Sequence, residues 1–123
     1  MRPYFNKKYE ELEKFLEAIF FDEDYERIEG DVRLLFNKFL RGYFDKKTSL
    51  KEIEFIKTIV FLSEDLLDPA NYPGYEILGD VTNRAYEDDN EARLWLKSFI
   101  EEMKRLLNEF LENHWDPEKG YRP

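Results

Sequence analysis

The sequence predicts an all-α protein, a single-domain antiparallel helical bundle of four long helices and one short helix over residues 1–123. Three observations support this prediction. Apolar residues recur at helical spacing in five stretches, no stretch alternates apolar and polar residues as a half-buried strand does, and the connections are short. Eleven Phe and eight Tyr in 123 residues indicate a folded core, because aromatic side chains bury large apolar areas.

The first two helices are each marked by an apolar stripe. The first is predicted over residues 4–21, with the stripe Phe5, Tyr9, Leu12, Leu16, Ile19 and Phe20. The acidic stretch DEDYERIEGD that follows is either a loop or the first turns of the second helix. That helix is predicted over residues 28–43 from the stripe Ile28, Val32, Leu35, Phe36, Phe39, Leu40 and Tyr43.

The third helix is expected to be the most central and to begin at Thr48 or Ser49. Ser49 and Glu52 have capping-box spacing, in which each side chain satisfies the backbone N–H of the other residue. Asp68-Pro69 ends the helix, because a residue before proline disfavours helical geometry. Its stripe is Leu50, Ile53, Ile56, Ile59, Val60 and Leu66 or Leu67, widened by Phe55, Phe61 and Leu62.

A turn, a short helix and a last long helix complete the chain. Pro73 and Gly74 supply turn geometry in the segment ANYPGY, and the short helix is predicted over residues 76–86. Asp88 or Asp89 caps the last helix, which runs to about Asn113 with the stripe Leu96, Phe99, Ile100, Met103, Leu106, Leu107, Phe110 and Leu111. The tail, about 116–123, is expected to be frayed.

Composition limits the classes of function. The chain has no Cys, its first residues lack the apolar run of a signal peptide, and its longest apolar run is far shorter than the roughly 20 residues that cross a bilayer. We therefore expect a cytoplasmic protein. The formal net charge of −9 argues against direct binding to nucleic acid or to an anionic membrane, and is compatible with a cationic partner.

No catalytic, metal or cofactor motif is present. The one histidine, His114, lacks the Glu-x-x-His pattern and is interpreted as a surface or helix C-cap residue rather than a ligand. A Cys nucleophile, phosphate loops and dinucleotide fingerprints are absent, and nothing singles out a catalytic pair among the 28 carboxylates. We therefore expect no enzyme, no cofactor and no metal.

The charge is concentrated in blocks. Residues 10–31 hold ten acids and two bases, residues 32–58 hold seven bases and three acids, and residues 59–91 hold nine acids and one base. The last block also contains Tyr72, Tyr75 and Tyr86. A solvated acidic surface explains part of this pattern, and acids at a helix N-terminus favour its dipole. The tyrosines are either contact residues of an interface or rings that fold back over the end of the bundle.

The run FLSEDLLDPANYPGYEILGD, followed by a short helix and ARLWLKSFIEEM, resembles the pattern of colicin D-type immunity proteins and related immunity proteins of contact-dependent growth inhibition systems. The resemblance covers about residues 59–103, and the turn in this chain is longer by Pro73-Gly74. It implies a small acidic helical protein, a monomer or weak dimer, that binds a basic nuclease toxin domain and blocks its active site. It implies no direct contact with nucleic acid or membrane.

The resemblance also implies a partner-binding surface in which carboxylates occupy a basic cleft in place of phosphates. The residues of this surface are Glu64, Asp65, Asp68, Tyr72, Tyr75, Glu76 and Asp80, with Asp88 and Asp89 as second-rank contributors. Charge reversal of Asp65 and Asp68 is expected to weaken the complex and leave the fold intact. Carboxylates that are scattered, or already paired with the chain's own Lys and Arg, would argue against this function.

Two other functions fit the same charges. A phage-type nucleic-acid mimic that inhibits a defence nuclease needs both acidic blocks on one face. A non-catalytic interaction domain, in which the basic block 33–57 meets acidic blocks of a neighbouring subunit, predicts self-association that weakens with salt. Size-exclusion chromatography at two salt concentrations distinguishes a self-associating interaction domain from an immunity protein.

Overall fold

The computed structural model describes residues 7–20, 44, 47–82 and 84–122, without the side chains of 19 and 20. Within them the chain is mainly helical, which confirms the all-α prediction. The elements are a 3-10 turn η1 (Lys7–Tyr9), helices α1 (Glu10–Phe20), α3 (Leu50–Leu66), α4 (Tyr75–Thr82) and α5 (Asp89–Asn113), and strands β1 (Trp115–Asp116) and β2 (Gly120–Tyr121). The predicted second helix, over 28–43, lies outside the described residues.

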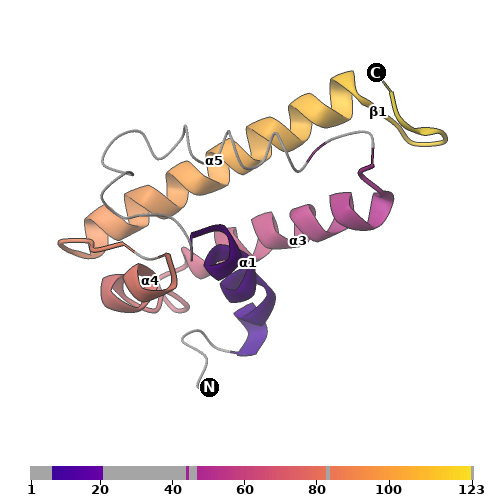
Figure 1. The fold of residues 1–123 in the computed structure, drawn as a ribbon. Coiled ribbons are helices and arrows are strands. Elements are labelled where there is room, and N and C mark those ends of the chain that lie inside the picture. Colours follow the sequence, from indigo (N-terminus) through magenta and orange to yellow (C-terminus); the bar gives the residue numbers. More distant parts are fainter. Residues whose placement is uncertain (1–6, 21–43, 45–46, 83, 123) are drawn as a thin grey trace.

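Helices α3 and α5 form the long axis of the molecule. They lie side by side and run in opposite chain directions (Figure 1). Helix α4 packs against α1 and α5 close to the beginning of α5, and α1 also packs against α3. The end of α3, the whole of α4 and the beginning of α5 therefore lie at one end of the molecule.

The buried side chains of these helices form one core. From α3 and α5 they include Ile53, Ile56, Ile59, Leu66, Leu96, Phe99, Met103, Leu106 and Phe110, and from α1 and α4 Leu12, Leu16, Leu78 and Val81. The predicted stripes are thus confirmed in their main positions. Two α3 positions differ, because Leu50 and Phe61 are 61% and 63% exposed. An apolar residue that only widens a helical stripe can equally point outward, and Phe61 does so.

Both predicted N-cap residues are confirmed, but among the described residues only one of the two bonds of the predicted Ser49–Glu52 capping box is formed. The Ser49 side chain accepts a hydrogen bond from the backbone N–H of Glu52, and the Asp88 side chain accepts one from the backbone N–H of Glu91 at 2.9 Å. Each satisfies one N–H group that the first turn of a helix leaves without a partner. Helix α3 ends at Leu66, two residues before Asp68-Pro69, as expected.

Helix α4 is shorter than the predicted range 76–86. It ends at Thr82, and the chain turns back so that the backbone N–H of Arg84 donates to the carbonyl of Gly79 at 2.9 Å. A Cβ atom on Gly79 would lie 2.5 Å from the Arg84 carbonyl oxygen. Gly79 therefore permits this close return of the backbone, and the helix stops where the return begins.

The predictions of a frayed tail and of no strand are both wrong. Strands β1 and β2 pair as an antiparallel hairpin, with Trp115 opposite Tyr121. The Asp116 carboxylate accepts the backbone N–H groups of Glu118 and Lys119, and Gly120 has a positive φ of 85°. The Trp115 and Tyr121 rings pack against Phe110 of α5. The turn Asp-Pro-Glu-Lys-Gly, with its Gly in the left-handed region, closes the hairpin. The aromatic residue before this turn and the one after it hold the hairpin against α5, so the tail is ordered.

Candidate functional site

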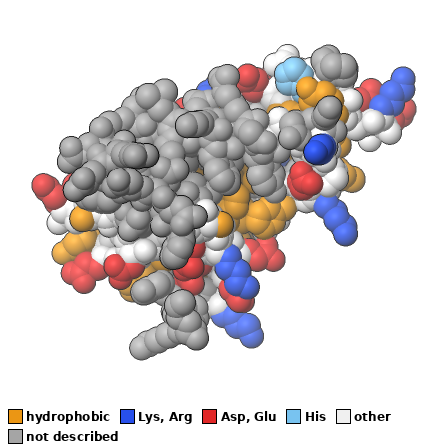
Figure 2. All heavy atoms as spheres, viewed as in Figure 1, with side chains coloured by type: hydrophobic (Ala, Val, Ile, Leu, Met, Phe, Trp, Pro, Cys, Tyr) orange, Lys and Arg blue, Asp and Glu red, His pale blue; other side chains and the backbone are white. Residues whose placement is uncertain are grey.

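The nine predicted partner-binding residues lie at the end of the molecule formed by the end of α3, the turn after it, α4 and the beginning of α5. On the face seen in Figure 2, Asp and Glu side chains gather over α4 and the beginning of α5, whereas the visible Lys and Arg side chains lie farther along the molecule. The sequence-adjacent acids of residues 64–89 are therefore also neighbours in space.

The turn between α3 and α4 is fixed by its own hydrogen bonds. The Asp68 carbonyl accepts the backbone N–H groups of Asn71 at 2.8 Å and Tyr72 at 3.0 Å, and its carboxylate accepts that of Ala70 at 2.9 Å. The Asn71 side chain donates back to the Asp65 carbonyl. Gly74 has φ 106°, a conformation that other residues rarely adopt. The turn therefore presents its side chains from an ordered backbone.

Two side chains of α5 connect this turn to the rest of the protein. The Asp89 carboxylate accepts the backbone N–H of Tyr75 at 3.0 Å. The Arg93 guanidinium donates to the carbonyl of Leu67 at 2.7 Å and lies over the Tyr72 ring, 5.0 Å from its centroid. The beginning of α5 thus holds the turn at both of its ends.

Tyr72 and Tyr75 are partly buried and lie among negative charges. Burial, together with the negative charge of Asp89, raises the pKa of Tyr72 to about 12. The negative charge of the Glu76 carboxylate raises the pKa of Tyr75. The Tyr72 hydroxyl is shielded from solvent and has no hydrogen-bond partner among the described residues. Both rings cover the end of the core and are also partly exposed at the surface. They can therefore be rings that fold back over the bundle and contact residues of an interface at the same time.

Tyr86, the third tyrosine of the acidic block, faces inward. Its hydroxyl lies 3.0 Å from that of Thr82, and its ring packs beside Trp95. Burial raises its pKa strongly. Tyr86 is therefore a partly buried residue that packs against the core and closes the turn after α4.

Two of the predicted carboxylates are already paired within the chain. The Lys104 ammonium lies 3.0 Å from the Glu64 carboxylate. The Asp65 carboxylate accepts the Lys8 ammonium at 2.7 Å and the Tyr9 hydroxyl at 2.6 Å. These two hydrogen bonds lower the pKa of Asp65, and the bond to Asp65 raises the pKa of Lys8. Glu64 and Asp65 thus stabilise contacts of α3 with α5 and with the N-terminal turn.

The other five carboxylates are exposed, and none forms an ion pair within the described part of the chain. Asp88 and Asp89 bond to backbone N–H groups, and Glu76 and Asp80 lie one helical turn apart on α4. Together with the two tyrosines they define what we call the acidic end: Asp68, Tyr72, Tyr75, Glu76, Asp80, Asp88 and Asp89.

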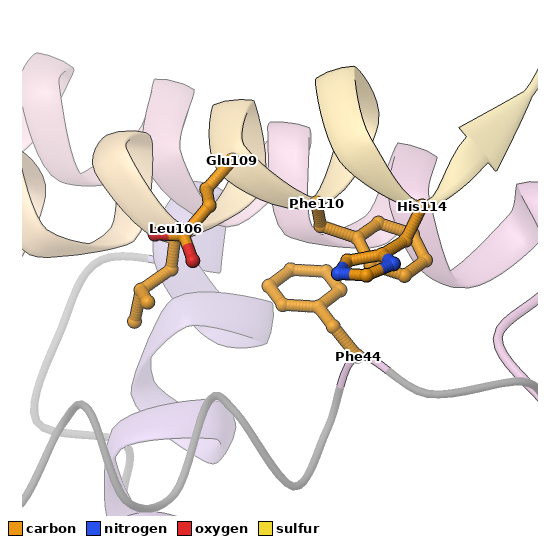
Figure 3. A pocket seen from close by; sticks show the side chains of 5 residues that line it. All are labelled: Phe44, Leu106, Glu109, Phe110 and His114. Carbon is orange, nitrogen blue, oxygen red and sulfur yellow. The ribbon is translucent and has the colours of Figure 1, made fainter. Parts of the chain in front are cut away.

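A hollow of about 180 Å³ lies at the opposite end of α5. Figure 3 shows Leu106 and Glu109 on one side of it and the rings of Phe44, Phe110 and His114 on the other. Its polar groups have internal contacts, because Glu109 pairs with Arg105 at 3.2 Å and the His114 Nδ1 lies 3.2 Å from the Arg122 carbonyl. His114 is the C-cap residue of α5, as predicted, and the contacts of Glu109 and His114 within the described residues account for the lining without a ligand.

Within the described residues, no three His, Asp or Glu side chains converge as a metal site would require. In the same part of the chain, each helix is too short or too polar to cross a membrane. Comparison of the chain with models of known families, with curated proteins and with solved structures gives no match. The geometry of the acidic end is therefore the main guide to function.

Proposed function

We propose that this chain is an immunity protein that binds a basic nuclease toxin domain through the acidic end and thereby blocks its active site. The observation that carries the proposal is the set of five exposed carboxylates without an ion pair among the described residues, arranged around Tyr72 and Tyr75. The family resemblance of residues 59–103 points to the same function.

The physical basis is complementarity of charge combined with rigidity. A nuclease cleft holds phosphates with Arg and Lys, and exposed carboxylates can pair with the same cations and exclude the substrate. Carboxylates that are not neutralised internally also steer the encounter with a basic partner and raise the association rate. Tyr72 and Tyr75 add contact area that loses little conformational entropy, because the turn already holds them.

The nine residues do not have equal weight in this proposal. Glu64 and Asp65 must exchange an internal ion pair for an external one, so their net contribution to binding is small. Reversing the charge of Asp65 would also break its bonds to Lys8 and Tyr9. Glu76 and Asp80 form no ion pair within the described residues and are the better positions for charge reversal.

The decisive experiment is co-production of this chain in bacteria with a basic C-terminal nuclease domain, which the proposal expects to be encoded by a neighbouring gene. We expect the wild-type chain to restore growth and to form a complex with the purified domain. The double variant Glu76→Lys, Asp80→Lys should lose both. The matched control Glu101→Lys, Glu112→Lys makes the same change of charge at exposed positions of α5 and should retain both. Equal loss in the two variants, or no complex with wild type, would contradict the proposal.

The proposal also covers location, catalysis, oligomeric state and the full fold. The chain acts in the cytoplasm as a non-catalytic monomer or weak dimer. Its predicted helix over 28–43 completes an antiparallel bundle of four long helices with α1, α3 and α5. Size-exclusion chromatography at low and high salt tests the oligomeric state, because a complex between acidic and basic blocks of two copies would dissociate as salt rises.

A further inference from the structure

Arg93 is a cation set among the acids of the proposed docking surface, yet it pairs with none of them. Asp89 lies four positions earlier on α5, the spacing at which a helical ion pair forms. Its carboxylate bonds instead to the Tyr75 backbone, and the Arg93 guanidinium bonds to the Leu67 carbonyl. Within the described residues Arg93 therefore forms no ion pair with these carboxylates, and it contacts a backbone carbonyl and a ring instead.

The contacts of Arg93 are suited to holding the turn. Its planar guanidinium donates to the carbonyl of Leu67, the C-cap residue of α3, at 2.7 Å, and covers the Tyr72 ring at 5.0 Å. A charged donor on a backbone carbonyl is stronger than a neutral one, and a guanidinium can stack on a ring as an ammonium cannot. One side chain thus fixes the backbone at the start of the turn and a ring within it.

We infer that Arg93 is a positioning residue of the acidic end, which holds residues 67–75 and the Tyr72 ring in the conformation that docks. This inference rests on the proposed docking function but makes predictions for the protein alone. Because the turn is ordered before the encounter, binding does not have to order it.

The test is amide hydrogen exchange of the full chain without a partner. In Arg93→Gln we expect the amides of Asn71, Tyr72 and Tyr75 to exchange about tenfold faster or more, while those of the α3 core near Ile56 remain protected. Lys97→Gln, one helical turn farther on α5, removes the same charge from an exposed position and should match wild type. Arg93→Lys should recover part of the protection, since an ammonium can bond to the carbonyl but cannot lie flat on the ring.

A second measurement separates positioning from charge. The positive charge of Arg93 lowers the pKa of Tyr72, so its removal from an intact turn must raise that pKa. If the ring is instead released to solvent, the loss of burial lowers the pKa toward its ordinary value of 10.0. We expect the fall in Arg93→Gln, followed by NMR of ring-labelled tyrosine.

Unchanged exchange in the turn, a rise in exchange spread equally over α3, or a higher Tyr72 pKa would each overturn the role of Arg93. These results are independent of the partner. Failure of the charge-reversal experiment would remove the docking function and leave the measured order of the turn unaffected, so the two failures are distinguishable.

Discussion

The Asp89 carboxylate accepts a hydrogen bond from the backbone N–H of Tyr75 at 3.0 Å, joining the first residue of α5 to the first residue of α4. This bond satisfies one of the N–H groups that α4 leaves without a helical partner, and it sets a negative charge where the helix dipole favours one. The same side chain adds to the charge of the acidic end. The Asp89 carboxylate therefore takes part both in the fold and in the proposed docking surface.

Replacing Asp89 by Ala should lower the free energy of unfolding by about 1 kcal/mol, because the start of α4 loses its partner. Asp89→Asn should lower it less, since an amide oxygen can still accept the Tyr75 N–H. Urea denaturation at neutral pH measures both. Asp80→Ala is the control, an exposed acid of α4 that should stay within about 0.5 kcal/mol of wild type. Equal effects of Asp89→Ala and Asp80→Ala would show that the bond contributes no stability.

If the proposed function holds, binding kinetics with a basic nuclease domain should show the role of Arg93 in the complex. Arg93→Gln makes the acidic end more negative, so the association rate should not fall. The dissociation rate should rise by about tenfold, because a loosened turn must be ordered again in every complex. Surface plasmon resonance at physiological salt separates the two rates, and Lys97→Gln provides the reference. A lower association rate with unchanged dissociation would mean that Arg93 acts through long-range charge instead.

The helices were predictable because their signals are local. The caps Ser49 and Asp88 and the apolar stripes of α3 and α5 each depend on residues within a few turns of one another. The end of α4 was not predictable from local signals, because it depends on the close return of the backbone from Arg84 to Gly79. The hairpin was missed although its turn residues are local, since a two-residue strand gives no alternating pattern.

The candidate site was predictable in place and only partly in detail. Acids adjacent in sequence across a turn stay adjacent in space, which brought residues 68–89 to one end of the molecule. The pairing of Glu64 with Lys104 and of Asp65 with Lys8 spans 40 or more positions, and no local pattern encodes it. Arg93 was overlooked for the same reason, since its contacts with Leu67 and Tyr72 arise only when α3 and α5 pack.

Tyr72 should make the stability of the protein depend on pH in the alkaline range. Its pKa is raised in the folded state from 10.0 to about 12, so ionisation of Tyr72 leaves the stability unchanged below pH 10 and lowers it as the pH rises toward 12. Tyr72→Phe should remove this dependence on pH. Denaturation of wild type and Tyr72→Phe at pH 8 to 12 measures the difference between their free energies of unfolding. The difference isolates Tyr72, because Tyr86 titrates in both proteins and its effect cancels.

At neutral pH the same substitution should cost nothing. The Tyr72 hydroxyl is shielded from water without a partner among the described residues, and replacing such a group with hydrogen removes a desolvation penalty. Tyr72→Phe is therefore expected to be as stable as wild type or more stable by up to about 1 kcal/mol. A clear loss of stability at pH 7 would show that the hydroxyl has a bonding role.

Asp65 should make stability depend on pH in the acid range, with the opposite sign. Its pKa is lowered below 3.8 by Lys8 and Tyr9, so its contribution is present above pH 3.8 and is lost as the pH falls through the folded-state value. We expect wild type to be more stable than Asp65→Asn at pH 6, and the difference to shrink below pH 4. Denaturation at pH 6, 4 and 3 measures the difference in free energy of unfolding between the two proteins. The titration of the other carboxylates is common to both and cancels in this difference. A difference that is independent of pH would show that the Asp65 charge does not hold the N-terminal turn to α3.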